Sequence, residues 1–216
     1  VAYAKELLGQ ADLVPYLGPV SFHSWNSSSI SDMMLTFIRD YMGTTDKILI
    51  TGEFGYNPGL WKTPEEFPTW QNAWFLANLI YRTVKYTGTN VILYWELEND
   101  YPMMSTDLEP YPAWHVFKQA VDTLKPGSVL VESASDDESL LGTVAALGPD
   151  GYATVQLLNK RDKPIRVVVR GLTVDQMAAI LCCENRYGED LGTITADNGV
   201  FTLEIPAKSM VSLHTP

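Results

Sequence analysis

Two patterns of hydrophobic and polar positions divide this chain. Up to about residue 125, short apolar runs alternate with stretches in which apolar residues recur every three or four positions. This alternation is typical of buried strands connected by amphipathic helices. From residue 128 onward, short strand-like runs follow one another, separated by turn residues such as Gly148, Pro164 and Gly199. We therefore predict two domains, residues 1–126 and residues 127–216.

The first part is predicted to contain three strand–helix units after an initial helix at residues 2–8. Strands are expected at residues 18–23, 48–51 and 91–95, followed by helices near residues 29–42, 69–86 and 113–124. Ser29 and Asp32 have the spacing of a capping box, and Gly43 is expected to end the same helix. Apolar strands that alternate with helices indicate a parallel sheet covered by helices. The predicted fold class is α/β, a partial TIM barrel, because a complete (β/α)8 barrel needs about 250 residues.

The second part is predicted to be an all-β antiparallel sandwich. Short strands at close spacing, with alternating polar and apolar positions, are typical of that fold. The expected strands cover residues 128–132, 142–147, 152–158, 165–170, 178–183, 192–195, 200–205 and 210–214. Cys182 and Cys183 are neighbours on one strand and would point to opposite faces. A disulfide between them would be strained, so both are expected to be free.

The composition narrows the classes of partner. Six Trp and eleven Tyr among 216 residues are a heavy aromatic load, and flat aromatic rings stack well on the faces of sugars. A formal net charge of −11 argues against nucleic acid, since binding to a phosphate backbone depends on Lys and Arg. No apolar run approaches the roughly 20 residues of a membrane span, so no membrane partner is expected.

No metal site or cofactor is predicted either. No cluster of Cys or His has the spacing of a zinc site, and the acidic run at residues 136–138 lacks the ligand spacing of a calcium loop. Gly52 and Gly55 flank a carboxylate, which would repel a phosphate. The sequence begins with Val1 inside a helical pattern and shows no signal-peptide segment, so the natural polypeptide is expected to extend upstream.

Candidate chemistry gathers where the three predicted parallel strands end. The side chains concerned are His23, Trp25 and Asn26, then Glu53 and Tyr56, then Trp95, Glu98 and Asn99. Sites of barrel folds form at the carboxyl ends of the strands, so we expect these residues to lie together. A carboxylate at the junction of a stiff strand and a glycine-flanked loop, as we expect Glu53 to be, suits a nucleophile. Taken singly, Glu53 and His23 would more often be ordinary strand-end residues; the combination favours a site.

Three short segments carry a resemblance to a known family. They are SFHSWN at residues 21–26, ITGEFGYNP at residues 50–58 and LYWELEND at residues 93–100. In their order and spacing the chain resembles the C-terminal part of a retaining glycoside hydrolase of the (β/α)8 clan whose two catalytic glutamates lie on strands four and seven. It looks most like family 30, with families 39 and 5 as near alternatives. Residues 124–131 and 202–214 resemble strands of the β-sandwich appended to such barrels.

The resemblance implies that Glu53 is the nucleophile of strand seven. A retaining enzyme also needs a second carboxyl group, about 5 to 5.5 Å away, as acid and base. The family supplies it from an Asn-Glu pair after strand four, and this sequence has no such pair before Glu53. Glu96 and Glu98 follow the last strand and fit a role in contacting substrate better.

The resemblance also assigns sugar contacts. His23 would contact the nucleophile or the sugar, and Trp95 would form the floor beneath the sugar ring. Candidate walls of the subsites are Trp25, Tyr56 and Trp61, and Asn26, Glu98 and Asn99 are further candidates for substrate contact. The tryptophans at helical positions, Trp70, Trp74 and Trp114, are expected to pack in the core.

Two functions from different classes follow. The first is a retaining β-glycosidase acting on polysaccharide or oligosaccharide, of which this chain is a C-terminal portion that is inactive alone. Its partners would be a carbohydrate substrate and the missing N-terminal half of the barrel, and its location extracellular or periplasmic by family analogy. The alternative is a non-catalytic carbohydrate-binding module with a degenerate barrel. In either case the sandwich is expected to act as a structural brace, because no strand shows clustered exposed aromatic residues.

Overall fold

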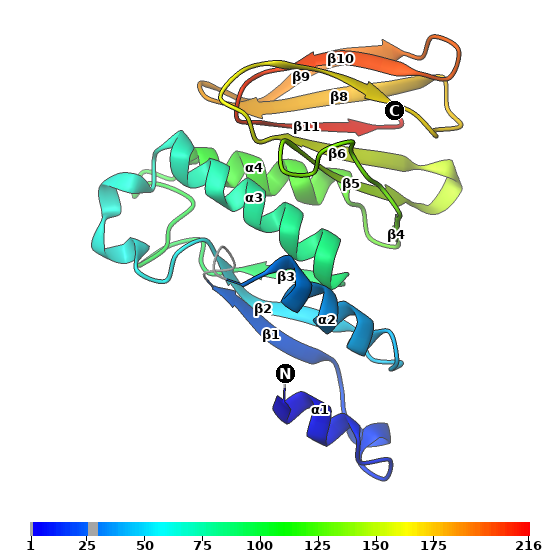
Figure 1. The fold of residues 1–216 in the computed structure, drawn as a ribbon. Coiled ribbons are helices and arrows are strands. Elements are labelled where there is room, and N and C mark those ends of the chain that lie inside the picture. The colour runs from blue at the N-terminus through cyan, green and yellow to red at the C-terminus, as the bar shows by residue number, and fades with distance from the viewer. Residues whose placement is uncertain (1, 26–29) are drawn as a thin grey trace.

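A computed structural model describes residues 2–25 and 30–216 of the chain. It contains a parallel sheet with its helices, followed by antiparallel sheets (Figure 1). The predicted fold class is therefore confirmed. Among the described residues, no helix combines the length and the apolar character needed to cross a membrane.

Within the described residues, the parallel part consists of three strand–helix units. Its elements are α1 (Ala2–Leu8), β1 (Val20–Trp25), α2 (Asp32–Met42), β2 (Leu49–Gly55), α3 (Trp70–Thr87), β3 (Val91–Tyr94) and α4 (Pro112–Thr123). The strands pair in the order β1-β2-β3, and both pairings are parallel. Short 3₁₀ turns cover Val14–Tyr16, Leu60–Lys62 and Pro64–Glu66. This part is called the barrel segment below.

A side-chain cap marks where α2 begins. The Oγ of Ser31 accepts a hydrogen bond from the Met34 amide at the start of α2. The capping box predicted from Ser29 and Asp32 is thus wrong, because Asp32 is already the first helical residue; Ser29 lies outside the described residues. Gly43 is the C-cap of α2, as predicted.

β2 is longer than the sequence pattern predicts. The predicted strand ended at residue 51, whereas β2 continues to Gly55. Glu53 therefore lies inside a strand and not at its junction with a loop, which corrects the prediction. The strand extends because β1 and β3 both pair with it beyond residue 51: Trp25 pairs with Gly55, and Tyr94 pairs with Phe54.

The antiparallel part is the sandwich. Its strands are β4 (Val129–Val131), β5 (Leu141–Leu147), β6 (Ala153–Asn159), β7 (Ile165–Val169), β8 (Gln176–Cys183), β9 (Arg186–Thr195), β10 (Phe201–Ile205) and β11 (Ser209–His214). A six-stranded sheet has the order β4-β5-β6-β11-β8-β9, and β10 pairs with β7 in a second sheet. A further 3₁₀ turn covers Pro149–Gly151. Cys182 and Cys183 are both free and buried. The division at residues 126 and 127 stays a prediction, although it falls between α4 and β4.

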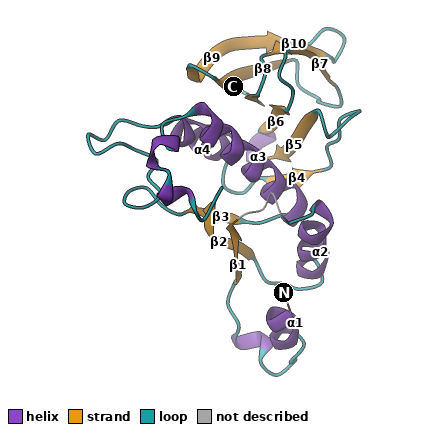
Figure 2. Ribbon diagram, turned by 60° about the vertical axis from the view of Figure 1, so that its left-hand side comes forward, coloured by secondary structure: helices purple, strands orange, loops and turns teal. Residues whose placement is uncertain are grey.

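Helices α3 and α4 lie side by side between the parallel sheet and the sandwich (Figure 1, and Figure 2 from another side). Both pack against the sandwich, α3 on β5 and β6 and α4 on β8, β9 and β11. Trp70 and Trp74 are buried in the shared core, and Trp114 packs against it. The prediction that these three tryptophans are packing residues agrees with this placement.

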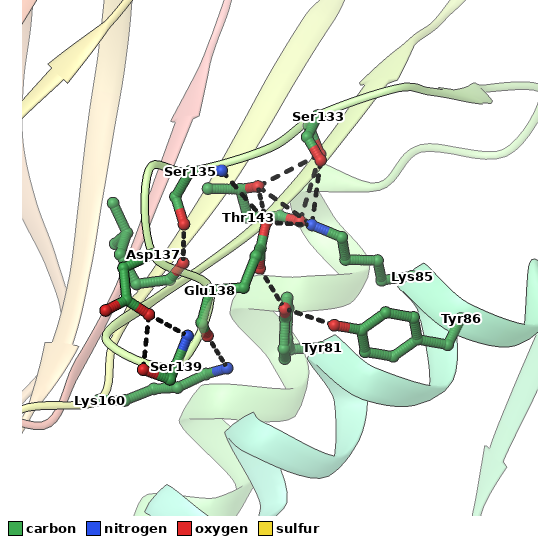
Figure 3. Close-up of polar contacts among 11 residues, drawn as sticks. Tyr81, Lys85, Tyr86, Ser133, Ser135, Asp137, Glu138, Ser139, Thr143 and Lys160 are labelled. Carbon is green, nitrogen blue, oxygen red and sulfur yellow. Dashed lines mark hydrogen bonds and ion pairs between the residues drawn. The ribbon is translucent and has the colours of Figure 1, made fainter. Parts of the chain in front are cut away.

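A half-buried polar cluster also joins α3 to the sandwich, and we call it the α3–sandwich joint (Tyr81, Lys85, Glu138 and Lys160; Figure 3). Glu138, between β4 and β5, accepts from the Tyr81 hydroxyl at 2.5 Å and from Lys85 Nζ at 2.6 Å. Lys160 Nζ lies 4.4 Å from the Tyr81 ring centre and donates to the Glu138 carbonyl at 2.7 Å. Burial raises the pKa of Glu138, but the hydrogen bonds from Lys85 and Tyr81 outweigh it, so the net pKa is lowered.

Candidate functional site

The pairing of β1 with β2 brings Glu53 and His23 together. The two residues are partners across the strands, and His23 Nδ1 lies 3.3 Å from Glu53 Oε2. The side chain of Glu53 is 31% exposed and that of His23 is 55% exposed. The carboxylate is thus held between two strands and remains accessible to a ligand.

A β-bulge in β2 decides which way Glu53 points. Phe22 pairs with Thr51, but the next residue, His23, pairs with Glu53, so Gly52 is the extra residue. An extra residue reverses the alternation of faces in the strand after it. Without the bulge, the Glu53 side chain would lie on the same face of the sheet as the side chain of Thr51. Thr51 is fully buried, so the bulge is what turns Glu53 to the accessible face.

The opposite face of the strand ends is covered by α3. Ser24 and Phe54 are partners on β1 and β2, and both are buried. The Ser24 hydroxyl lies 3.2 Å from the Thr83 hydroxyl of α3, within hydrogen-bond distance. Because neighbours in a strand point to opposite faces, His23 and Glu53 face away from α3. This is the face that lines the interior in a barrel.

Trp25 supplies the second contact to the carboxylate. Its Nε1 donates to Glu53 Oε2 at 3.0 Å, so His23 and Trp25 both approach the same oxygen. The ring of Trp25 lies directly over Gly55: a Cβ on Gly55 would be only 2.4 Å from Cζ3 of the ring. Gly55 therefore makes room for the tryptophan, and it belongs to β2 and not to the loop that the sequence predicted after Glu53. The hydrogen bond from Trp25 and the close approach of His23 together hold the carboxylate in one orientation.

Tyr101 is a residue of the site that the sequence reasoning missed. It lies on the loop after β3, and its ring centre is 5.0 Å from that of Trp25. Its hydroxyl donates to the carbonyl of Pro58, on the loop after β2, at 2.6 Å. The quoted segment at residues 93–100 stops one residue short of it. Tyr101 could have been found in the sequence, because it is an aromatic residue on the loop after the third strand, just as Tyr56 is on the loop after the second.

The predicted residues after β3 lie on an exposed loop. The amide of Trp95 donates to the carbonyl of Phe54 at 2.9 Å. Trp95 as a whole is 43% exposed. The Trp95–Glu96 peptide bond is cis. Glu98 and Asn99 are exposed, and Asn99 has a positive φ of 66°. Their roles in sugar contact stay predictions.

The remaining predicted residues differ in their surroundings. Tyr56 stacks on Phe75 of α3 with ring centres 4.3 Å apart, and burial followed by the charge of Glu66 raises its pKa. One face of its ring is thus covered by the protein. Trp61 lies on a 3₁₀ turn and is 50% exposed, with Lys62 Nζ 5.2 Å from its ring centre. Asn26 lies outside the described residues.

The described part of the chain offers no arrangement for a metal ion. No group of three or more His, Cys, Asp or Glu side chains in residues 2–25 and 30–216 could hold one. The chemistry that the site itself offers is that of a positioned carboxylate beside aromatic rings. Such a group can act as a nucleophile or a base.

Comparison with known proteins relates the sandwich to one family. The family model for the glycosyl hydrolase family 30 beta sandwich domain matches residues 127–213. No curated protein matches the chain by sequence.

Solved structures match nearly the whole chain. The family 30 subfamily 8 xylanase Xyn30A from Clostridium acetobutylicum aligns with a TM-score of 0.80 at 16% identity, covering 99% of this chain and 52% of that one. The catalytic domain of family 30 xylanase C from Talaromyces cellulolyticus gives 0.72 at 17% identity, covering 98% and 48%. A family 39 glycoside hydrolase from Bacteroides cellulosilyticus WH2 gives 0.63 at 14% identity, covering 97% and 46%.

The chain spans about half the length of these structures. Its two parts occur in them in the same arrangement, a portion of a barrel followed by a sandwich. The chain therefore has the fold of the C-terminal portion of family 30 glycoside hydrolases, and its sandwich is related to theirs by sequence as well.

Proposed function

We propose that the chain is the C-terminal portion of a retaining glycoside hydrolase, with Glu53 as the nucleophile. The observation that carries this proposal is the Glu53 carboxylate, held by His23 and Trp25 near the carboxyl end of a barrel strand. Active sites of barrel enzymes are built at that end of the strands. The relationship to family 30 supports the same reaction class.

The geometry assigns different roles to the two oxygens of the Glu53 carboxylate. Oε2 receives both contacts, from His23 and from Trp25, so Oε1 is the oxygen suited to attack the anomeric carbon. In that step the Glu53–sugar bond forms, the glycosidic bond breaks, and an acid group protonates the leaving oxygen. Water then cleaves the glycosyl ester, with the same group acting as base. Strands upstream of β1 would supply this second carboxyl group, since two such groups must lie about 5 to 5.5 Å apart.

The substrate class follows from the same relatives. Two of the aligned structures are described as xylanases, so a β-linked polysaccharide or oligosaccharide is the proposed substrate. Trp95 would stack on the sugar face, and Trp25 would hold the nucleophile. An extracellular or periplasmic location is proposed with this substrate, because an enzyme encounters polysaccharides in those compartments.

The decisive test is covalent trapping of Glu53 in the full-length protein. An activated 2-fluoro glycoside should add one sugar mass to the peptide that contains Glu53, because the fluorine slows hydrolysis of the glycosyl ester. Glu53→Gln should abolish labelling and lower kcat by at least about 1,000-fold with an unchanged fold. Glu109→Gln, an exposed carboxylate on the loop after β3, is the matched control and should keep the labelling. Labelling of another carboxylate would refute the assignment.

The exposure of Trp61 and Trp95 favours one alternative, a non-catalytic carbohydrate-binding module. In that case the chain alone would bind a soluble glycan in a calorimeter, and Glu53→Gln would leave the affinity unchanged. The enzyme proposal predicts that Glu53 is labelled in the trapping experiment, whereas the binding-module proposal predicts glycan binding that does not depend on Glu53. The two experiments together decide between the proposals.

A further inference from the structure

We propose that Tyr101 is a positioning residue that holds the Glu53 carboxylate through Trp25. This inference rests on the proposed function, because it assigns a role at the same site. Tyr101 itself does not contact Glu53; its ring packs on Trp25 at 5.0 Å with the planes inclined by 53°, and Trp25 donates to Glu53.

Tyr101 is fixed at both its side chain and its backbone. Its hydroxyl donates to the Pro58 carbonyl at 2.6 Å. Its own carbonyl accepts from the Tyr94 hydroxyl at 3.3 Å and from the Glu96 amide at 3.4 Å. Tyr94 is the last residue of β3 and is largely buried, which raises the pKa of its hydroxyl, so the hydroxyl stays protonated and remains a donor.

These contacts connect the end of β1 with the loops that follow β2 and β3. Pro58 lies after β2, Glu96 lies after β3, and Trp25 is the last residue of β1. Tyr101 therefore couples the loops after β2 and β3 to the Trp25 ring, which donates to the Glu53 carboxylate. Side chains that touch substrate need such support, because a displacement of about 1 Å can cost about 100-fold in rate.

Two neighbours hold the Trp25 ring. Gly55 lies beneath it with no Cβ in the way, and Tyr101 packs against it. A tryptophan side chain has only two rotatable bonds, so contacts to its ring also fix the direction of its N–H. Removing the Tyr101 ring leaves Trp25 free to turn away from Glu53 Oε2. Removing only the hydroxyl keeps this contact.

The first experiment reads the indole N–H of Trp25 in this chain by ¹⁵N NMR, assigned with Trp25→Phe. We expect Tyr101→Ala to speed solvent exchange of that proton at least about 10-fold and Tyr101→Phe to change it less than about 3-fold. The Trp70 indole, which donates to the Lys208 carbonyl at 3.2 Å, is the internal control and should not change. Leu108→Ala, an exposed position on the same loop, is the matched control variant.

The second experiment measures kinetics in the full-length protein. Tyr101→Ala should lower kcat about 10- to 100-fold with KM within about 3-fold, while Tyr101→Phe retains most of kcat. A purely structural role would lower the amount of folded enzyme, measured by active-site titration, and leave kcat per active site unchanged; that result would overturn the proposal.

The two proposals fail in different ways. An unchanged Trp25 signal in Tyr101→Ala, with Trp70 intact, would refute the positioning role whatever the activity. Loss of the Trp70 signal in Tyr101→Ala would mean that this variant does not fold correctly. The exchange of the Trp25 indole proton is then measured in Tyr101→Leu, which fills much of the space without an aromatic ring, and the same outcomes support or refute the positioning role. A failure of the proposed function would appear as no labelling of Glu53, while the Trp25 signal still responds to Tyr101.

Discussion

In the sandwich, β6 is buried at all seven of its positions, whereas β3 of the barrel segment has no fully buried residue. The difference comes from what covers each strand. β6 lies inside a six-stranded sheet and has helices on one side, while β3 is the last strand of a three-stranded sheet with an exposed inner face. Leu93 on β3 is accordingly 52% exposed, and Leu213 on β11 is 0% exposed.

The helices repeat the contrast. Twelve of the residues of α3 are buried, because this helix lies between the two parts. Helix α2 buries only Leu35 and Met42 and leaves Met33, Met34 and Phe37 exposed. The sandwich and α3 thus carry the stability of the described chain, and the candidate site lies on the weakly covered sheet. Rigidity at the site must come from local contacts such as those of Trp25 and Tyr101.

The largest expected effect separates the two regions with one type of substitution. Leu213→Ala should lower the free energy of unfolding by about 3 kcal/mol, because it opens a cavity in the sandwich core. Leu93→Ala should cost less than about 1 kcal/mol, because the side chain is half exposed already. Urea unfolding followed by circular dichroism measures both. Equal costs would break the comparison.

The next effect concerns the site itself. Gly55→Ala places a methyl group against the Trp25 ring and should destabilise the barrel segment by about 2 kcal/mol while weakening the Trp25–Glu53 hydrogen bond. The Trp25 indole signal and urea unfolding report on it. Gly18→Ala is the control, because a Cβ there meets nothing within 4 Å. If Gly55→Ala behaves like Gly18→Ala, the close approach of ring and backbone is not tight.

A smaller effect tests the α3–sandwich joint. Glu138→Gln leaves Lys85 without its carboxylate and should cost about 1 to 2 kcal/mol at pH 7. Glu132→Gln, exposed at the start of the same loop, should cost almost nothing. Unfolding in urea measures both variants.

The pH dependence of the same variant follows from the lowered pKa of Glu138. An unfolded Glu has a pKa of about 4.3, and the folded value lies below it. The stabilisation is therefore fully present above about pH 4.3 and is lost as the pH falls through the folded value. The difference between the wild type and Glu138→Gln should shrink over that range. A difference that stays constant down to pH 3 would contradict this role for the carboxylate.

The smallest effect on stability is expected at Trp61. Trp61→Ala should change the free energy of unfolding by less than about 0.5 kcal/mol, because half of the residue is exposed. If Trp61 is a wall of a subsite, the affinity of the full-length protein for a glycan should fall in calorimetry. Tyr16→Ala, another exposed aromatic residue, should leave that affinity unchanged. Equal affinities in the two variants would remove Trp61 from the site.

Much of the fold could be predicted because its signals are local. Three strand–helix units and eight sandwich strands appear where periodicity and turn residues indicated them, and Gly43 ends α2 as its position suggested. Boundaries that depend on pairing were less accurate. β9 begins at Arg186, six residues before the predicted start, because the whole hairpin with β8 is paired.

The sequence by itself determined that a carboxylate, a histidine and several aromatic rings gather near the carboxyl ends of neighbouring parallel strands. Only the tertiary structure decided that Glu53 and His23 face the same side, because that depends on the bulge at Gly52, and a shift of one residue turns a side chain to the other face. The place of the Trp25 ring over Gly55 and the contacts of Tyr101 were likewise set by tertiary structure. They join loops far apart in sequence, and no local pattern encodes such a distance.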